Sequence, residues 1–155
     1  MSKDGWKING CPHVDAAMAT LGNKLYITAF SEAQGKPAIY LASSSDGETF
    51  TPKRAVSLGT TDPTHPFLTA SEDRLGVVFQ ARDSEKEGWG KMQVYYREVS
   101  PDGTVSPLMR AGTGPSGASF PSAALGLSGR TFVGWTQTGE DGSKALLVRG
   151  RRTTP

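Results

Sequence analysis

Side chains that could do chemistry gather in two short polar segments of this chain, residues 61–65 and residues 81–89. Arg82 lies just after a strand-like run that ends in an aromatic residue, Phe79. A planar guanidinium at such a position can hold a carboxylate through two hydrogen bonds. That carboxylate belongs either to a ligand or to the chain itself, where Asp62 and Asp83 are the candidates. The two segments therefore predict a ligand-binding arginine or an internal ion pair.

The same segments hold an aromatic side chain and a histidine with two interpretations each. Trp89 lies between two glycines in a charged stretch, where it can stack on a sugar or a partner protein, or fold back on a sheet edge. His65 and Asp62 have the residue types of an acid–base pair, but a histidine beside a proline at a strand entry also has structural roles. The spacing of His13, Asp15 and His65 fits no metal-ligand pattern, so we predict no metal site.

The composition describes one turn-rich domain. The 155 residues are 36% hydrophobic and include 19 glycines and 10 prolines, which without a collagen period indicates an all-β fold of short strands. No apolar run approaches the roughly 20 residues that span a bilayer, and a net charge of +2 does not point to nucleic acid. Cys11 is the only cysteine, so no internal disulfide forms. We expect no cofactor, membrane or nucleic-acid partner.

A repeated unit explains this composition. Three segments align without gaps, each starting in a polar turn and ending in an aromatic residue: 23–30, 72–79 and 128–135. Their last residues, Phe30, Phe79 and Trp135, are 49 and 56 residues apart. Periods near 50 residues are typical of four-stranded propeller blades. We therefore divide the single domain, residues 1–155, into a closure segment and three blades: 1–12, 13–59, 60–112 and 113–155.

Within this repeat the strand patterns are uneven. The first unit predicts strands at residues 14–20, 24–30, 38–43 and 49–56. In the second unit the first strand is expected only at residues 67–70. The third unit lacks or borrows its outer strand, and residues 5–9 are either a plain arm or an outer strand donated to a neighbouring blade.

The run from Ser43 to Phe50 reads as a hairpin turn with an aromatic anchor. Its aspartate can accept backbone N–H groups, its glycine allows a positive φ, and its final aromatic can pack beneath the turn. Ser44, Asp46, Gly47, Thr49 and Phe50 resemble the Asp-box of sialidase-like (BNR) β-propellers, shortened by one residue between the aspartate and the threonine.

Two further segments extend the resemblance. Residues 6–12 look like a segment that precedes the later blades of bacterial exported six-bladed sialidase-like proteins, and residues 117–121 with 131–136 are similar to their final blade. The resemblance implies an all-β fold of three four-stranded blades, the C-terminal half of a six-bladed β-propeller. The relatives are exported, whereas residues 1–6 lack the apolar core of a signal peptide, so the location stays unassigned.

The resemblance also implies where a ligand would bind. Asp-boxes lie on the propeller face opposite the active site, and the opposite face carries the connections between blades and between second and third strands. It would gather the predicted ligand-binding residues, which are Arg82, Asp83, Trp89, Asp62, His65 and Asp15.

Catalysis is not favoured by the same comparison. Sialidases use three arginines, a tyrosine–glutamate pair and an acid/base aspartate, and their Arg-Ile-Pro motif is absent here. The sequence favours a non-enzymatic module that binds a carbohydrate or a protein. One alternative is a glycosidase active only when the ring is completed, drawing on Tyr95, Tyr96, Arg82, Arg97 and Arg110. Another is a structural scaffold. The ring would be completed by a head-to-tail homodimer or by a missing N-terminal half.

Overall fold

The structure, a computed structural model, describes residues 15–35, 37–83, 90–112, 117–126, 129–142 and 144–152. These residues contain one 3₁₀ turn, η1 (Ala33–Gly35), and no α-helix. No helix in these ranges could cross a membrane. The strands in chain order are β1 (Ala16–Leu21), β2 (Lys24–Ser31), β3 (Ala38–Ser44), β4 (Arg54–Ala55), β5 (Thr60–Ala70), β6 (Leu75–Asp83), β7 (Gln93–Val99), β8 (Met109–Arg110), β9 (Gly117–Leu125), β10 (Arg130–Thr138) and β11 (Lys144–Arg152).

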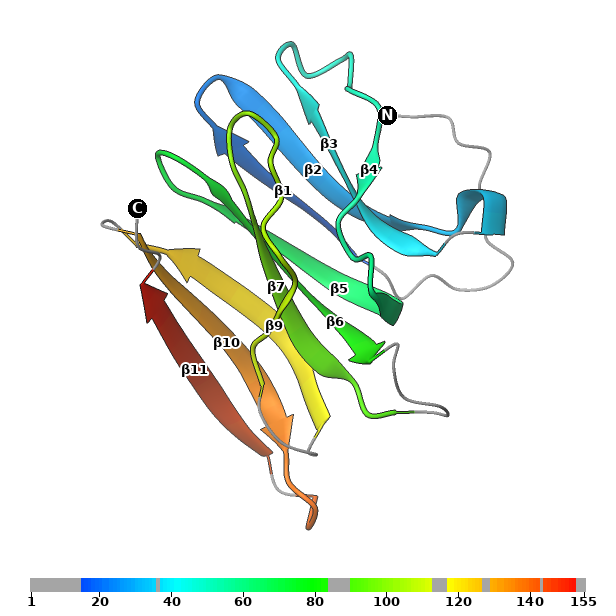
Figure 1. The fold of residues 1–155 in the computed structure, drawn as a ribbon, viewed down its shortest axis with the longest axis vertical. Coiled ribbons are helices and arrows are strands. Elements are labelled where there is room, and N and C mark those ends of the chain that lie inside the picture. Colours follow the sequence, from blue (N-terminus) through cyan, green and yellow to red (C-terminus); the bar gives the residue numbers. More distant parts are fainter. Residues whose placement is uncertain are drawn as a thin grey trace.

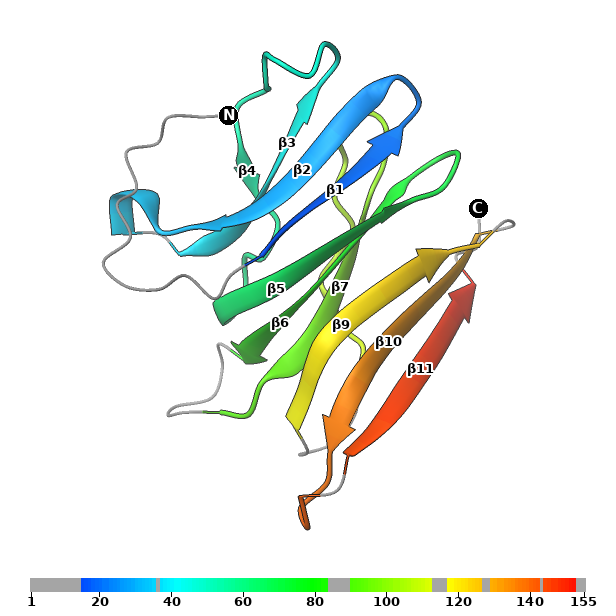
Figure 2. The same cartoon turned by 180° about the vertical axis from the view of Figure 1, so that it is seen from behind.

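The strands form three antiparallel sheets, each following the chain order. The first is β1-β2-β3-β4, the second β5-β6-β7-β8 and the third β9-β10-β11. The sheets lie next to one another, with β5 between β1 and β9 (Figures 1 and 2). This is the predicted all-β arrangement of three consecutive propeller blades. The third blade has three strands rather than four in the described ranges, as expected for a blade that lacks or borrows its outer strand.

The middle blade is covered on both faces. Val77 and Phe79 of β6 belong to a core cluster shared with the first blade, whereas Val78 belongs to a cluster shared with Val133 and Trp135 of the third blade. Because both faces of β6 are buried, its sequence is a continuous run of buried residues rather than an alternation. The blades are therefore held together by two apolar interfaces.

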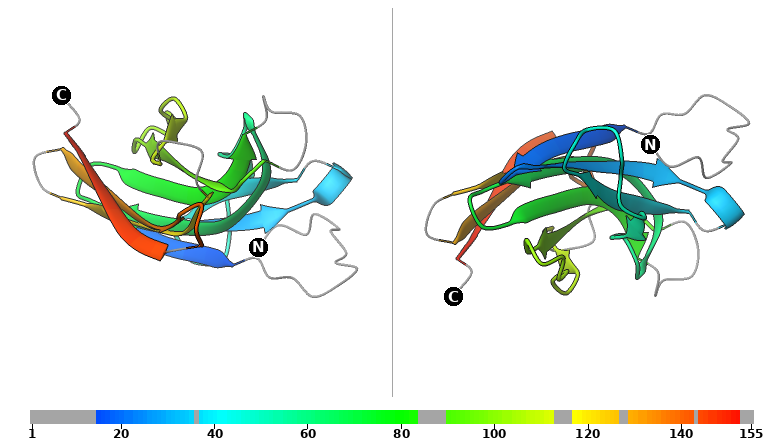
Figure 3. Two further views of the ribbon diagram at one scale, coloured as in Figure 1. Left: turned by 90° about the horizontal axis from the view of Figure 1, so that it is seen from below. Right: turned by 90° about the horizontal axis from the view of Figure 1, so that it is seen from above.

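The ends of the strands define two faces of the molecule. At the entry face, β1, β5 and β9 begin and β2, β6 and β10 end (Figure 2). At the turn face lie the hairpin between β1 and β2, the turn between β3 and β4, and the connection between β7 and β8. Figure 3 shows that this last connection stands out to one side of the sheets. The predicted ligand-binding residues that the structure describes and the Asp-box-like turn thus lie at opposite faces.

Two strands differ from the sequence prediction. The strand expected at residues 49–56 is reduced to the two residues of β4, because residues 45–50 form the turn. β5 begins at Thr60, seven residues before the predicted start. Pro63 and Pro66 suggested a loop there, but an innermost strand tolerates prolines where bulges interrupt its ladder.

Candidate functional site

The first half of β5 is bulged twice. Thr61 pairs with Arg82 and Thr64 with Gln80, so one extra residue lies between these pairs, and a second lies between Thr64 and Phe67. Asp62 and His65 have left-handed backbones, each with a φ of 49°. Bulges re-aim side chains and end regular pairing. Both side chains are therefore placed by strand irregularities at the entry face.

β9, which lies beside β5, also has a bulge with a left-handed residue. Its ladder to β10 shifts by one residue between Gly134 and Thr136, where Phe120 has a φ of 53°. Both His65 and Phe120 precede a proline, which disfavours helical backbone at the residue before it. A left-handed non-glycine residue costs roughly 1–2 kcal/mol. Within the described ranges, Asp62, His65 and Phe120 are the non-glycine residues with positive φ, and such strain concentrates at functional sites.

Arg82 and Asp62 form an ion pair across β5 and β6. The guanidinium Nε donates to Asp62 Oδ2 at 3.0 Å, and Nη1 donates to the carbonyl of Gly90. The Asp62 side chain is 60% exposed and that of Arg82 is 23% exposed. The structure thus contains the internal ion pair that the sequence left open. It fixes the arginine while leaving much of the carboxylate in solvent.

An aromatic ring lies at the same face. Phe120 is 66% exposed, and its ring contacts His65 edge to face, with ring centroids 5.9 Å apart. His65 Nδ1 lies 3.1 Å from Thr64 Oγ1. The Phe120 backbone N–H donates to Gln80 Oε1 at 2.9 Å, and Gln80 is buried. Gln80, the β6 partner of Thr64, therefore joins the bulged segments of β5 and β9.

Beneath this face, Tyr95 stacks on Phe79 with ring centroids 6.0 Å apart. Burial raises the pKa of Tyr95, and the negative charge of Asp83 acts in the same direction, with Arg110 opposing them. The phenol is therefore a neutral side chain of the core rather than a phenolate.

Most predicted ligand-binding residues share the entry face. Asp62 and Arg82 are in contact, His65 contacts Phe120, and Asp83 ends β6 opposite Thr60. Asp15 lies exposed immediately before β1 at this face. Trp89 and His13 lie outside the described residues. We define the axial cluster as Asp62, His65, Gln80, Arg82 and Phe120.

Sequence reasoning missed Phe120 and Gln80. The signal for Phe120 is the repeat of a ring-bearing residue before proline, His65-Pro66 in the second blade and Phe120-Pro121 in the third. No comparable signal exists for Gln80, because its side-chain contact to β9 depends on how the blades pack.

Two residues of the glycosidase alternative, Tyr96 and Arg97, make contacts elsewhere in the fold. Tyr96 lies buried between the second and third blades, where its hydroxyl donates to Glu98 at 2.8 Å and burial raises its pKa. Arg97 donates to the carbonyls of Ser106 and Leu58, both at 2.9 Å, and burial lowers its pKa. The tyrosine–glutamate pair is therefore an interior contact without access to a substrate.

The Asp-box-like turn has the hydrogen bonds expected from its sequence. Asp46 Oδ1 accepts from the backbone N–H groups of Glu48 and Thr49 and from the Ser44 hydroxyl, at 2.8–2.9 Å. Gly47 has a φ of 79°. These bonds hold the Asp46 pKa far below its ordinary value. Phe50 is half-buried and lies outside both core clusters, so its role as an aromatic anchor stays a prediction, whereas the turn's own hydrogen bonds are present.

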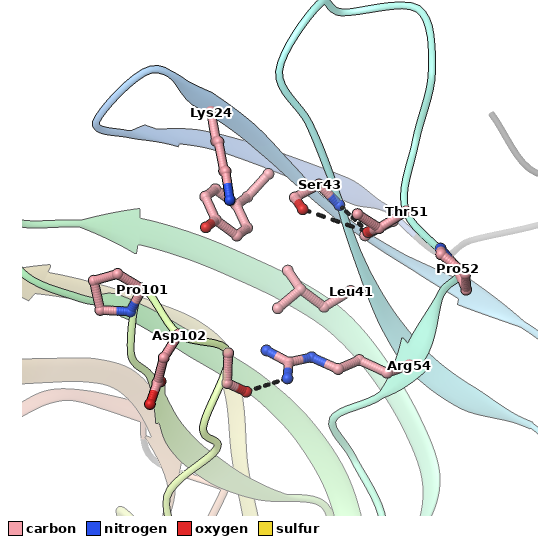
Figure 4. Close-up of a pocket in the computed structure, with 11 residues that line it drawn as sticks. Lys24, Leu41, Ser43, Thr51, Pro52, Arg54, Pro101 and Asp102 are labelled. Atoms are coloured by element: carbon pink, nitrogen blue, oxygen red, sulfur yellow. Dashed lines mark hydrogen bonds between the residues drawn. The ribbon is translucent and has the colours of Figure 1, made fainter.

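A groove of about 280 Å³ lies at the turn face between the first two blades (Figure 4). Lys24, Tyr26, Arg54 and Asp102 are among its lining residues, and the Arg54 guanidinium donates to the Gly103 carbonyl. This bond ties β4 to the β7–β8 turn. Within the described ranges, no three potential metal ligands cluster at either face.

The geometry defines half of a β-propeller with a polar and aromatic cluster at the entry face, and solved structures agree with this class. The chain is similar to an α-L-arabinanase of Penicillium chrysogenum solved with arabinobiose, at 15% identity and a TM-score of 0.62, over 89% of this chain and 46% of that one. It is similar to the GH93 α-L-arabinofuranosidase of Fusarium graminearum, at 11% identity and a TM-score of 0.61, over 90% and 46% of the chains. It is also similar to an endo-arabinase of Bacteroides thetaiotaomicron, at 14% identity and a TM-score of 0.54, over 86% of this chain and 54% of that one.

The chain spans about half the length of the structures it matches. No protein-family model and no curated protein matches the sequence. At such low identity the likeness concerns the β-propeller fold, and it does not single out the sialidase-like family.

Proposed function

We propose that this chain is a non-enzymatic, sialidase-like propeller module that binds a carbohydrate at the axial cluster. The observation that carries the proposal is the exposed ring of Phe120, which a strained, bulged backbone holds at the entry face. A flat ring with an open face suits the apolar side of a sugar. The Asp62 carboxylate, which lies three residues before His65 on β5 and is 60% exposed, can accept sugar hydroxyl groups.

The ion pair supports binding rather than hydrolysis. Arg82 occupies one edge of the Asp62 carboxylate and also donates to the Gly90 carbonyl, so both groups are oriented by the protein. Hydrolysis of a glycoside ordinarily needs two carboxyl groups about 5–9.5 Å apart with different protonation. Within the axial cluster the Asp62 carboxylate is held by the Arg82 guanidinium, an arrangement that suits hydrogen bonding to sugar hydroxyl groups.

Calorimetric titration with arabino-oligosaccharides and with sialyllactose tests the proposal. We expect binding of one of these sugars by the wild type and at least a tenfold loss for Phe120→Ala, about 1.4 kcal/mol. Leu58→Ala is the matched control, because Leu58 is 65% exposed and lies outside the cluster. Asp62→Asn keeps the shape of the side chain and should weaken binding less than Phe120→Ala. Equal affinities of Phe120→Ala and the wild type would overturn the assignment of this site.

The second candidate is a glycosidase, which the likeness to an α-L-arabinanase and an α-L-arabinofuranosidase favours. It predicts release of chromophore from 4-nitrophenyl α-L-arabinofuranoside or from a fluorogenic sialoside. Turnover that is present in the wild type and lost in Asp62→Asn would replace the non-enzymatic proposal. Absence of turnover together with sugar binding would support it.

A further inference from the structure

The packing of the three blades repeats in one direction. The first blade presents Ala17, Tyr26 and Leu41 to the second, and the second presents Val78 and the neighbouring β7 residues to the third. We call the face that a blade turns toward the next blade along the chain its leading face, and the opposite face its trailing face. Each interface then joins the leading face of one blade to the trailing face of the next. Among the residues that the structure describes, no blade packs against the leading face of the third blade or the trailing face of the first.

The trailing face of the first blade is apolar near its inner edge. By strand register, Met18 pairs with Ile27, and Ile27 pairs with Ala42, so all three lie on the face away from the core. Met18 is 65% exposed and Ile27 is half-buried. Met18, Ile27 and Ala42 thus form a continuous apolar row across three strands, the kind of exposed patch that marks an interaction surface.

The leading face of the third blade has the matching character. Phe132 pairs with Ala124, and neither belongs to the core cluster shared with the second blade. Phe132 is 40% exposed, and Ala124 is exposed. Met18 and Phe132 are two of the five large hydrophobic residues that the described structure exposes, and they mark the two uncovered blade faces.

We propose that a second copy of this chain covers both faces, so that two chains close head to tail into a six-bladed ring. The chain spans 46% of two similar structures, so the complete fold needs about as much chain again. Each copy has one uncovered leading face and one uncovered trailing face. In a dimer with two-fold symmetry all four faces are buried, so no face remains free to bind a third copy. The ring would place two axial clusters around one axis.

Measurement of mass by sedimentation equilibrium or light scattering tests this without any ligand, so its failure is separate from failure of the proposed sugar binding. At roughly micromolar concentrations the wild type should have twice the chain mass. Met18→Lys and Phe132→Glu should each raise the dissociation constant at least tenfold, because each places a charge in both interfaces. Leu58→Lys is the matched control, with the same 65% exposure as Met18 but a position between β4 and β5.

Mixing the two variants distinguishes a head-to-tail ring from other dimers. A mixed dimer of Met18→Lys with Phe132→Glu has one wild-type interface and one that joins opposite charges, so it should form where neither variant pairs with itself. A face-to-face dimer through the first blade alone would form equally well with Phe132→Glu as with the wild type. That result would overturn the ring. A monomeric wild type, or open-ended growth, would also overturn it. Circular dichroism confirms that each variant is folded.

Discussion

Replacing Glu98 by alanine should loosen the third blade from the second. One carboxylate oxygen, Glu98 Oε1, accepts from Tyr96 Oη at 2.8 Å and from Thr131 Oγ1 at 2.9 Å. The same oxygen lies 3.5 Å from Arg74 Nε, and the Arg74 and Glu98 side chains are 9% and 16% exposed. Thr131 belongs to the third blade, and Arg74 also donates to the carbonyl of Arg130. Glu98 is therefore the polar centre of this blade interface.

The size of the loss follows from the groups that Glu98 satisfies. A hydrogen bond to a charged group contributes about 1.5–3 kcal/mol, and a buried donor left without a partner adds to the loss. Arg74 keeps its ion pair with Asp73 at 2.9 Å, which limits the damage. We expect Glu98→Ala to lower the free energy of unfolding by about 3 kcal/mol, and Glu98→Gln by about half as much because its oxygen can still accept. For a chain of this size, a loss of 3 kcal/mol corresponds to roughly 6–12 °C in Tm.

Thermal and urea unfolding, followed by circular dichroism and tryptophan fluorescence, provide the measurement. Trp135 is 4% exposed in the core shared by these two blades and should report their separation. Glu72→Ala is the control, because Glu72 is an exposed carboxylate at the turn before Arg74 and should change stability by less than about 0.5 kcal/mol. Equal losses in Glu98→Ala and Glu72→Ala would refute the role of this carboxylate. A double-mutant cycle with Thr131→Val should give a coupling of at least about 0.5 kcal/mol.

Other predictions concern the turn face and the middle blade. Hydrogen bonds hold the Asp46 pKa far below 3.8, so the ionised carboxylate stabilises the fold above about pH 4, and this stabilisation is lost as the pH falls. The difference in the free energy of unfolding between the wild type and Asp46→Asn should therefore become smaller on acidification. A difference that does not change with pH would contradict this. Gly47→Ala should cost roughly 1 kcal/mol because of its positive φ, whereas Gly90→Ala, with open space at its Cβ, should be nearly neutral in the same urea titration. Gly76→Ala places a Cβ 3.1 Å from the Tyr96 ring, which its hydrogen bond to Glu98 holds in place. We therefore expect the free energy of unfolding to fall by about 1 kcal/mol. An unchanged urea midpoint would contradict this expectation.

Local chemistry along the chain explains which elements could be predicted. The strand β3, with its run of apolar and small residues, and the turn at Asp46 depend on neighbouring residues, and both form where the sequence places them. The start of β5 could not be predicted in the same way. Pro63 and Pro66 break local strand patterns, and only pairing with β6 and contact with β9 make this bulged segment part of a sheet.

The axial cluster could likewise be predicted from the sequence only in part. The order of residues along the chain predicted Asp62, His65 and Arg82 for one face, because the entry loops of a repeated blade must share an end. Which carboxylate pairs with Arg82 was left open, since Asp83 adjoins it in sequence whereas Asp62 is twenty residues away and comes into contact through the β5–β6 ladder.

The sequence by itself determined the repeat, the all-β class and the hydrogen-bonded turn, since each depends on periodicity or on contacts within a few residues. Only the tertiary structure decided that Phe120 joins His65, that Glu98 and Arg74 connect two blades, and that Met18 and Phe132 face outward. Those relations join residues far apart in the chain, and their geometry is set by how whole sheets pack rather than by any local preference.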